Sequence, residues 1–204
     1  MAIQLAKGQG IDLRKGNGVP DEVIIGLGWK IQASGERSVS SVADFDLDAI
    51  AFLLDENDRV RDRGDARLEG GDIVFFNSRR HSSGAVLHTG DNRKGGNGVD
   101  DDEQIVVHPG RLPLFCRRVL FLVCIYQGQK RGQHLAQVEC AYIRAVGHDG
   151  TELARHSLNA EPSHAGCCSL VFGELHRRGP GWTFRAIGEA HPYDSFVHIL
   201  KQHL

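Results

Sequence analysis

The sequence predicts an all-β protein, an antiparallel β-sandwich of two sheets that ends in a short helix. Two features of the chain lead to this prediction. Apolar and polar residues alternate in short runs, which is the period of a strand and not of a helix. These runs are separated by turns rich in Asp and in the 25 glycines of the 204-residue chain, and Asp149-Gly150 is a strong hairpin signal. Short strands at this spacing favour an antiparallel sandwich over βαβ units.

The predicted strands follow one another along most of the chain. The clearest is Asp46–Leu54, where period-two spacing places three Asp residues, beginning with Asp44, on the same face as Ile50. We interpret it as a strand that enters the core from a polar rim. In order, the predicted strands are Val23–Leu27, Asp46–Leu54, Ile73–Phe76, Val86–His88, Gln104–Val107, Val119–Tyr126, Gln137–Val146, Glu152–Leu158, Gly166–Glu174 and Trp182–Glu189.

The tail from Tyr193 to Leu204 has a different pattern. Phe196, Ile199, Leu200 and His203 recur at steps of three and four residues, after Pro192. This spacing predicts a short amphipathic helix that packs on the sandwich. No composition shift marks a boundary elsewhere, so we expect a single domain over residues 1–204.

The segment Gly90–Glu103 is the most informative part of the chain for function. It holds five carboxylates, two Asn side chains and four glycines. Such a segment cannot enter a core, because each desolvated carboxylate would need a partner. Glycines let a loop fold back and point oxygens inward, and Ca²⁺ takes 6–8 oxygen ligands of these kinds. The segment therefore predicts a calcium site.

The alternative is an ordinary solvated acidic loop. Acids are contiguous from Asp100 to Glu103, and without a counter-ion they repel one another at close range. We therefore favour a metal site. The EF-hand pattern does not fit, because Arg93 and Gly95 occupy the third and fifth positions counted from Asp91.

A second acidic cluster is formed by Asp44, Asp46 and Asp48 on the predicted strand. These residues either cap the entrance of the strand or contribute to the cation site. Because the acidic loop exists as well, we expect the two clusters to meet at one end of the sandwich.

The chain resembles the TerD family of tellurium-resistance and stress-response proteins, with matching motifs in order along nearly its whole length. The resemblance implies a calcium-binding β-sandwich without known catalytic activity, found mainly in bacterial cytoplasm. The matching motifs are Gly26-Leu27-Gly28-Trp29, Asp44-Phe45-Asp46-Leu47-Asp48-Ala49, Val74-Phe75-Phe76-Asn77, Val86-Leu87-His88-Thr89-Gly90-Asp91-Asn92, Asp101-Asp102-Glu103 and Trp182-Thr183-Phe184-Arg185-Ala186-Ile187-Gly188. By the same resemblance, the implied Ca²⁺ ligands are Asp46, Asp48, Asn77, Asp91, Asn92, Asp101, Asp102 and Glu103.

We therefore expect a non-catalytic calcium-binding protein of a bacterial stress-response system of the tellurite-resistance type, which acts through a protein partner. The rival hypothesis is a hydrolase that uses the same carboxylates to hold Mg²⁺ or Mn²⁺ and a reactive water. A third possibility is a calcium module that docks on membranes, for which Arg79-Arg80-His81 offers weak support. Selectivity for Ca²⁺ over Mg²⁺ separates the enzyme from the other two.

Composition narrows the remaining possibilities. A net charge of −2 and a pI near 6.6 give no overall attraction to nucleic acid. The longest apolar run, Val119 to Tyr126, is far shorter than the roughly 20 residues of a membrane-spanning helix. The first residues lack the order of a secretion signal. Five cysteines without a Cys-x-x-Cys pair do not suggest a disulfide framework, so we expect a cytoplasmic protein.

Overall fold

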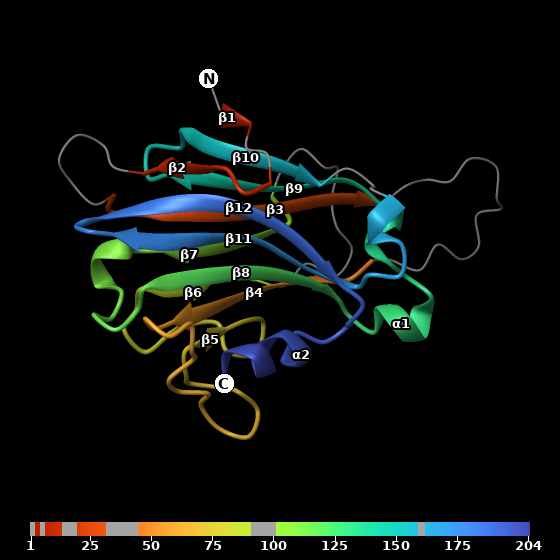
Figure 1. The fold of residues 1–204 in the computed structure, drawn as a ribbon, viewed down its shortest axis with the longest axis horizontal. Coiled ribbons are helices and arrows are strands. Elements are labelled where there is room, and N and C mark those ends of the chain that lie inside the picture. Colours follow the sequence, from red (N-terminus) through yellow and green to blue (C-terminus); the bar gives the residue numbers. More distant parts are fainter. Residues whose placement is uncertain (1–2, 5–6, 14–19, 32–44, 91–100, 159–161) are drawn as a thin grey trace.

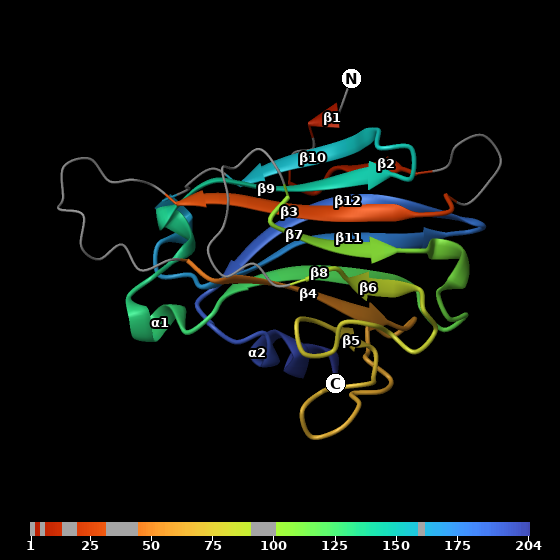
Figure 2. The ribbon, with the colours of Figure 1, turned by 180° about the vertical axis from the view of Figure 1, so that it is seen from behind.

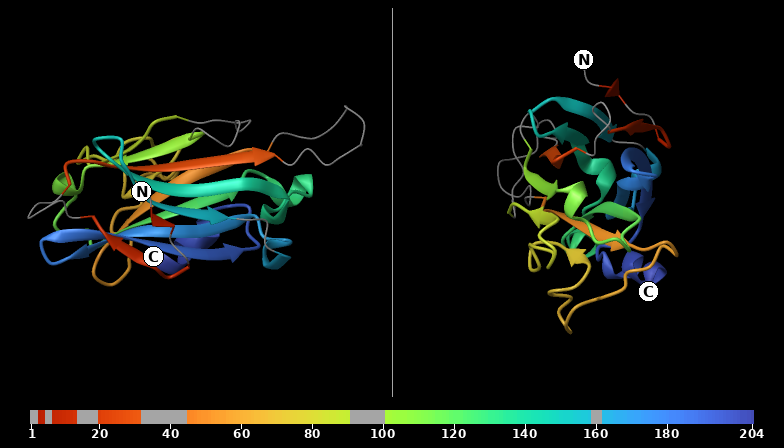
Figure 3. Two further views of the ribbon diagram at one scale, coloured as in Figure 1. Left: turned by 90° about the horizontal axis from the view of Figure 1, so that it is seen from above. Right: turned by 90° about the vertical axis from the view of Figure 1, so that its left-hand side faces the viewer.

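The structure is a computed structural model, which describes residues 3–4, 7–13, 20–31, 45–90, 101–158 and 162–204. These residues form two six-stranded sheets that pack face to face (Figures 1 and 3). The predicted two-sheet β-sandwich with a helical C-terminus is confirmed. The two ends of the chain lie on opposite sides of the molecule in Figure 1.

The first sheet, here sheet A, has the order β1-β10-β9-β3-β7-β6. Its strands pair antiparallel, except that β1 and β10 run parallel. Its bounds are β1 Ile3–Gln4, β3 Val23–Ile31, β6 Val86–His88, β7 Glu103–Val107, β9 Val138–Gly147 and β10 Glu152–Leu158.

The second sheet, sheet B, has the order β2-β12-β11-β8-β4-β5 and is antiparallel throughout. Its bounds are β2 Gly10–Asp12, β4 Leu47–Leu54, β5 Ile73–Val74, β8 Arg118–Ile125, β11 Ser169–Arg178 and β12 Gly181–His191.

Helices are short in the described part of the chain, and none is long and apolar enough to cross a membrane. The α-helices are α1 Gly128–Arg131 and α2 Val197–Leu200. The 3-10 turns are Pro109–Arg111, Leu135–Gln137, Pro162–His164 and Lys201–His203.

The interior strands β3 and β11 each end four residues later than predicted, at Ile31 and Arg178. Further differences from the predicted strands lie at the sheet edges. The strands Ile3–Gln4 and Gly10–Asp12 were missed, because two or three residues are too few to show an alternating pattern. Strand β5 ends at Val74, two residues earlier than expected. Phe75 and Ser78 instead exchange two backbone hydrogen bonds, which closes a tight turn there.

Two apolar layers result from the alternation along the strands. In β4, Leu47, Ala49, Ala51 and Leu53 point between the sheets into the main core. Ile50, Phe52 and Leu54 point to the outer side of sheet B, where α2 covers them with Ile199 and Leu200 (Figure 1). The amphipathic tail therefore packs on the sandwich as its periodicity predicts, although the α-helical part is only one turn long.

The glycines of the Gly26-Leu27-Gly28-Trp29 motif make room on the outer face of sheet A. A Cβ atom on Gly28 would lie 2.5 Å from the ring of Tyr142, and one on Gly26 would lie 2.2 Å from the carboxylate of Asp101. The Tyr142 ring thus lies directly against the backbone of β3. Arg155 covers its other side, with its guanidinium carbon 4.0 Å from the ring centroid.

Replacing Gly28 should therefore destabilise the fold. We expect Gly28→Ala to lower the free energy of unfolding by about 1–3 kcal/mol, because the added methyl group displaces the Tyr142 ring. Gly110→Ala is the matched control, since nothing lies within 4 Å of its added Cβ. Chemical denaturation measures both.

The clash between the added methyl group and the Tyr142 ring also predicts that variants at positions 28 and 142 have non-additive effects on stability. In the background of Tyr142→Ala, the cost of Gly28→Ala should fall by about 0.5 kcal/mol or more, because the clashing ring is gone. Additive costs would show that the glycine serves backbone conformation and not the ring.

Candidate functional site

Most of the predicted ligands lie at one end of the sandwich, where β3 ends and β4 and β7 begin. Figure 2 shows β3, β7 and β6 side by side, with β4 of sheet B beneath them. Strand β3 ends here, and β4 and β7 begin here. The acidic cluster that precedes and enters β4, and the acidic segment that ends at Glu103, therefore both lead to this end. We call it the acidic end.

Glu103, the first residue of β7, joins the two sheets. Its Oε2 atom accepts a hydrogen bond of 2.7 Å from the backbone N–H of Ala49 in β4. The same oxygen lies 3.3 Å from Nε2 of His88, and both side chains are fully buried. Because Nδ1 of His88 accepts the Gly90 N–H at 3.2 Å, a neutral ring carries its hydrogen on Nε2. That atom is buried near the carboxylate but makes no hydrogen bond with the described residues.

Ala49 needs this partner because of where β5 stops. On this side of β4, Ala51 faces Val74 of β5, and the Leu53 N–H bonds the carbonyl of Asp72. Strand β5 does not extend far enough to reach Ala49. A buried N–H without an acceptor costs about 1–3 kcal/mol, and the Glu103 carboxylate supplies that acceptor.

Removing Glu103 should therefore be costly even without a bound ion. We expect Glu103→Ala to lower the free energy of unfolding by about 3–5 kcal/mol, because it leaves buried polar groups without their charged partner. Glu103→Gln, which keeps an acceptor for Ala49, should cost about 1–2 kcal/mol. Glu69→Ala, an exposed acid in a loop, is the control and should stay within about 0.5 kcal/mol. Equal effects of Ala and Gln at position 103 would contradict the role of the acceptor.

Asp102 closes the end of β3. Its Oδ2 accepts a hydrogen bond of 2.9 Å from the backbone N–H of Trp29, and its own N–H bonds the carbonyl of Leu27 at 2.8 Å. The side chain thus sits at the edge between β3 and β7. It lies one residue from the buried Glu103.

The strand residues Asp46 and Asp48 approach the same end on the outer side of sheet B. They share a face of β4 with Ile50, whose side chain belongs to the outer apolar layer. Asp48 is buried and lies opposite Cys124 of β8 in the register. Burial, and next the negative charge of Asp48, raise the pKa of the Cys124 thiol. Asp48 and Glu103 thus lie at the same end of the sandwich, on opposite faces of β4. That the two acidic clusters form one site stays a prediction.

Asp101 belongs to an ion network on the outer face of sheet A. Its carboxylate accepts hydrogen bonds from Arg144 at 2.7 and 2.9 Å, from the hydroxyl of Tyr142 at 2.9 Å and from Gln104 at 2.9 Å. Burial, followed by the charge of Asp101, raises the pKa of Tyr142 to about 12. Arg144 also pairs with Glu152 at 3.3 Å. Both oxygens of Asp101 are committed to this network.

Of the three remaining predicted ligands, Asn77 alone lies within the described residues. Asn77 is exposed in the turn closed by Phe75 and Ser78, and within the described residues it bonds none of the other predicted ligands. Asp91 and Asn92 lie outside the described residues.

The suitability of these residues for Ca²⁺ follows from what each already contacts. Asp46, Asp48, Asp102 and Glu103 supply oxygen donors of the type that Ca²⁺ prefers. Asp101 does not fit, since Arg144 already neutralises it with two hydrogen bonds. Among the described residues, no group of three or more His, Cys, Asp or Glu side chains is arranged to hold a metal ion. A complete site therefore needs ligands from residues 91–100.

Sequence reasoning did not find the partners of the acidic residues. His88 was predicted only as the end of a strand, and the structure places it against Glu103. Arg144 lies 43 positions from Asp101 in the chain, and only the pairing of β3 with β9 brings the two together. The glycines at positions 26 and 28 were the signal available in the sequence. A strand without side chains on one face leaves space there, which side chains of neighbouring strands can fill.

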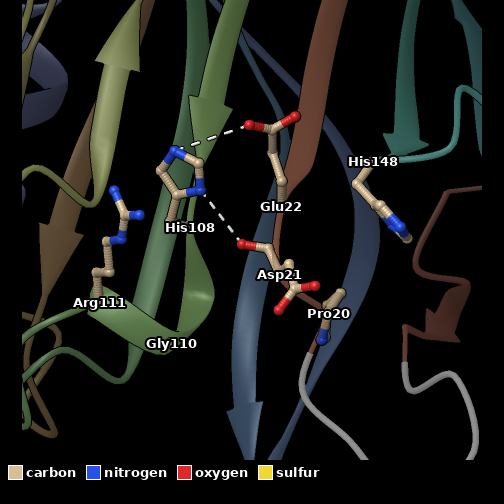
Figure 4. A pocket seen from close by; sticks show the side chains of 7 residues that line it. All are labelled: Pro20, Asp21, Glu22, His108, Gly110, Arg111 and His148. Atoms are coloured by element: carbon tan, nitrogen blue, oxygen red, sulfur yellow. Dashed lines mark hydrogen bonds and ion pairs between the residues drawn. The ribbon is translucent and has the colours of Figure 1, made fainter.

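A separate polar pocket of about 560 Å³ lies at the other end of sheet A (Figure 4). His108 there contacts Glu22, with Nε2 3.7 Å from the carboxylate, and its Nδ1 lies 3.2 Å from the backbone oxygen of Asp21. The pocket borders Val23, the first residue of β3, whereas Glu103 pairs with Leu27. It is thus about 13 Å or more from the acidic end at 3.3 Å per residue.

Comparison with known proteins identifies the family. The TerD domain model matches residues 1–203. The chain belongs to the TerD family. Tellurium resistance protein TerX of Serratia marcescens is 42% identical, with all of both chains covered. General stress protein 16U of Bacillus subtilis (strain 168) is 33% identical over 94% of this chain and 92% of its own.

Solved structures agree on the fold of this TerD-family chain. The crystal structure of a homologue of telluride resistance protein (TerD) from Streptomyces coelicolor A3(2) superimposes with a TM-score of 0.63. It is 19% identical, and the match covers 91% of this chain and 98% of the other. At this identity, the likeness concerns the fold alone.

Proposed function

We propose that this TerD-family protein is a non-catalytic Ca²⁺-binding protein of a bacterial cytoplasmic stress response, and that it acts through a protein partner. Its relatives carry the names of tellurium resistance and general stress proteins. The observation that supports the proposal best is the bond between Glu103 and Ala49, which brings the acidic loop against the acidic strand.

The proposed ligands are acids of the two acidic segments at this end of the sandwich, together with residues of the segment before them. Asp46, Asp48, Asp102 and Glu103 would hold the ion together with Asp91 and Asn92 of the preceding segment. Asp101 is left out because Arg144 holds it. When bound, Ca²⁺ would neutralise the repulsion among these acids and fix the segments that connect β3 to β4 and β6 to β7.

Calcium should stabilise the protein by mass action. An ion that binds only the folded state adds about 2.7 kcal/mol at 100 times its Kd, so the melting temperature should rise with Ca²⁺ and fall with chelator. Calorimetric titration of chelator-stripped protein with Mg²⁺ present measures the affinity and the selectivity. An unchanged melting temperature in metal-free protein argues against the proposal, and a preference for Mg²⁺ or Mn²⁺ favours the hydrolase.

Variants that remove one charge each test the contribution of the individual acids to Ca²⁺ binding. Asp102→Asn keeps an oxygen that accepts the Trp29 N–H, yet it should weaken Ca²⁺ binding by about tenfold, equivalent to about 1.4 kcal/mol. Asp48→Asn should do the same. The double variant should lose less affinity than the sum of the single losses, by about 0.5–1.4 kcal/mol, because both residues serve one site.

Asp101→Asn is the matched control. It should destabilise the fold, since it weakens the bonds to Arg144, but it should leave the Ca²⁺ affinity within about twofold of the native protein. A tenfold loss of affinity in this variant would place Asp101 in the ligand set and overturn the assignment made from its contacts.

A further inference from the structure

A second polar pocket lies on the outer face of sheet B, at the end opposite to the acidic end. Its volume is about 400 Å³. It is built where β4 ends, β8 and β12 begin, and β11 ends, towards the left in Figure 1. Its lining residues are Asp55, Glu56, Asp58, Arg117, Arg118, Glu174, His176, Arg178 and Arg185.

The base of this arginine pocket is a buried carboxylate held by two guanidinium groups. Glu174 is fully buried. Its Oε2 accepts hydrogen bonds from Arg118, with Nε at 2.7 Å, and its Oε1 accepts from Arg185, with Nε at 2.9 Å. Each guanidinium places two nitrogens, Nε and Nη2, on one oxygen of Glu174, and these paired contacts fix the guanidinium planes. Arg118 and Arg185 are therefore held in place before any ligand arrives.

The four arginines and four carboxylates that line the pocket are equal in number, but they are not paired one to one. All four lining carboxylates are engaged by arginines, since Asp58 pairs with Arg118 at 2.6 Å and Arg61 binds both Asp55 and Glu56. By contrast, neither Arg117 nor Arg178 makes an ion pair with any residue in the described part of the chain. Both are exposed at the pocket, so two guanidinium groups there have no acidic partner.

The C-terminal segment closes the apolar part of this face and stops at the pocket. The carbonyl of His203 accepts the N–H of Val60 at 2.8 Å, and its ring nitrogen lies 2.9 Å from the carbonyl of Asp58. These contacts anchor the turn that carries Asp55 and Asp58. The pocket wall is therefore tied to the end of the chain, while Arg117 and Arg178 face solvent.

We propose that this arginine pocket binds a small oxyanion of the phosphate class, either free or as a phosphate ester. Guanidinium groups donate paired hydrogen bonds that match the oxygens of phosphate. Arg117 and Arg178 supply guanidinium groups that no carboxylate of the described residues engages, and Arg185, held by Glu174, supplies further donors. A volume near 400 Å³ is within the range of small-molecule sites.

His176 provides a spectroscopic reporter inside the pocket. Burial and the charge of Arg178 lower the pKa of His176 below its ordinary value of 6.5, against the opposing influence of Glu174; Arg118 and Arg185 lower it as well. A bound anion offsets these positive charges. Oxyanion binding should therefore raise the pKa of His176, and the exposed His148, which lines the separate pocket on sheet A, should not respond.

The test is a titration of the full chain, with chelator present and at constant ionic strength, using inorganic phosphate and glycerol phosphate. Histidine NMR as a function of pH should show saturable binding and a rise in the pKa of His176. Arg117→Gln and Arg178→Gln should each weaken binding by about tenfold, equivalent to about 1.4 kcal/mol, whereas the exposed Arg63→Gln control should not. Tighter binding of glycerol phosphate would identify an ester as the ligand.

Two results would overturn the proposal. One is the absence of saturable binding of either probe by folded protein. The other is an equal loss of binding in the Arg63→Gln control, which would reduce the effect to overall charge. Because the titration excludes free Ca²⁺, its outcome is independent of the calcium proposal.

Discussion

The structure depends on one buried hydrogen bond between the sheets, from the Ala49 N–H to the Glu103 carboxylate. The main core is apolar and non-directional, so it does not by itself fix how sheet A sits along sheet B. A buried carboxylate must lie within hydrogen-bonding distance of its donor, so it fixes how one sheet sits along the other. Its loss leaves both Ala49 and His88 without their partner, which is why the acidic end is a structural joint as well as a candidate cation site.

The same end shows how acids with adjacent numbers acquire different surroundings. Asp101, Asp102 and Glu103 point in turn to the outer face, the strand edge and the inter-sheet core. Asp101 reaches Arg144 only because Gly26 leaves space beside it. Contiguous carboxylates that would repel one another in a free loop are thus separated by the sandwich and partly neutralised by it.

Sheet B carries different charged groups near its two ends. Asp46 and Asp48 stand near the start of β4, and the arginine pocket lies beyond its end. The two regions are separated by the apolar layer under α2. A cation site and an oxyanion site at the two ends of β4 would be connected by a strand about 26 Å long, at 3.3 Å per residue over its eight residues.

The sequence by itself determined the fold class, the family and the concentration of acids in two segments. Strand periodicity and ordered motifs are local properties, so they can be read without coordinates. Only the tertiary structure decided which acids pair with which groups. His88 and Glu103, or Arg118 and Glu174, lie far apart in the chain, and strand register brings them together. The arginine pocket was not predicted for the same reason: its arginines come from three neighbouring strands and the residues beside them, and each alone looks like scattered surface charge.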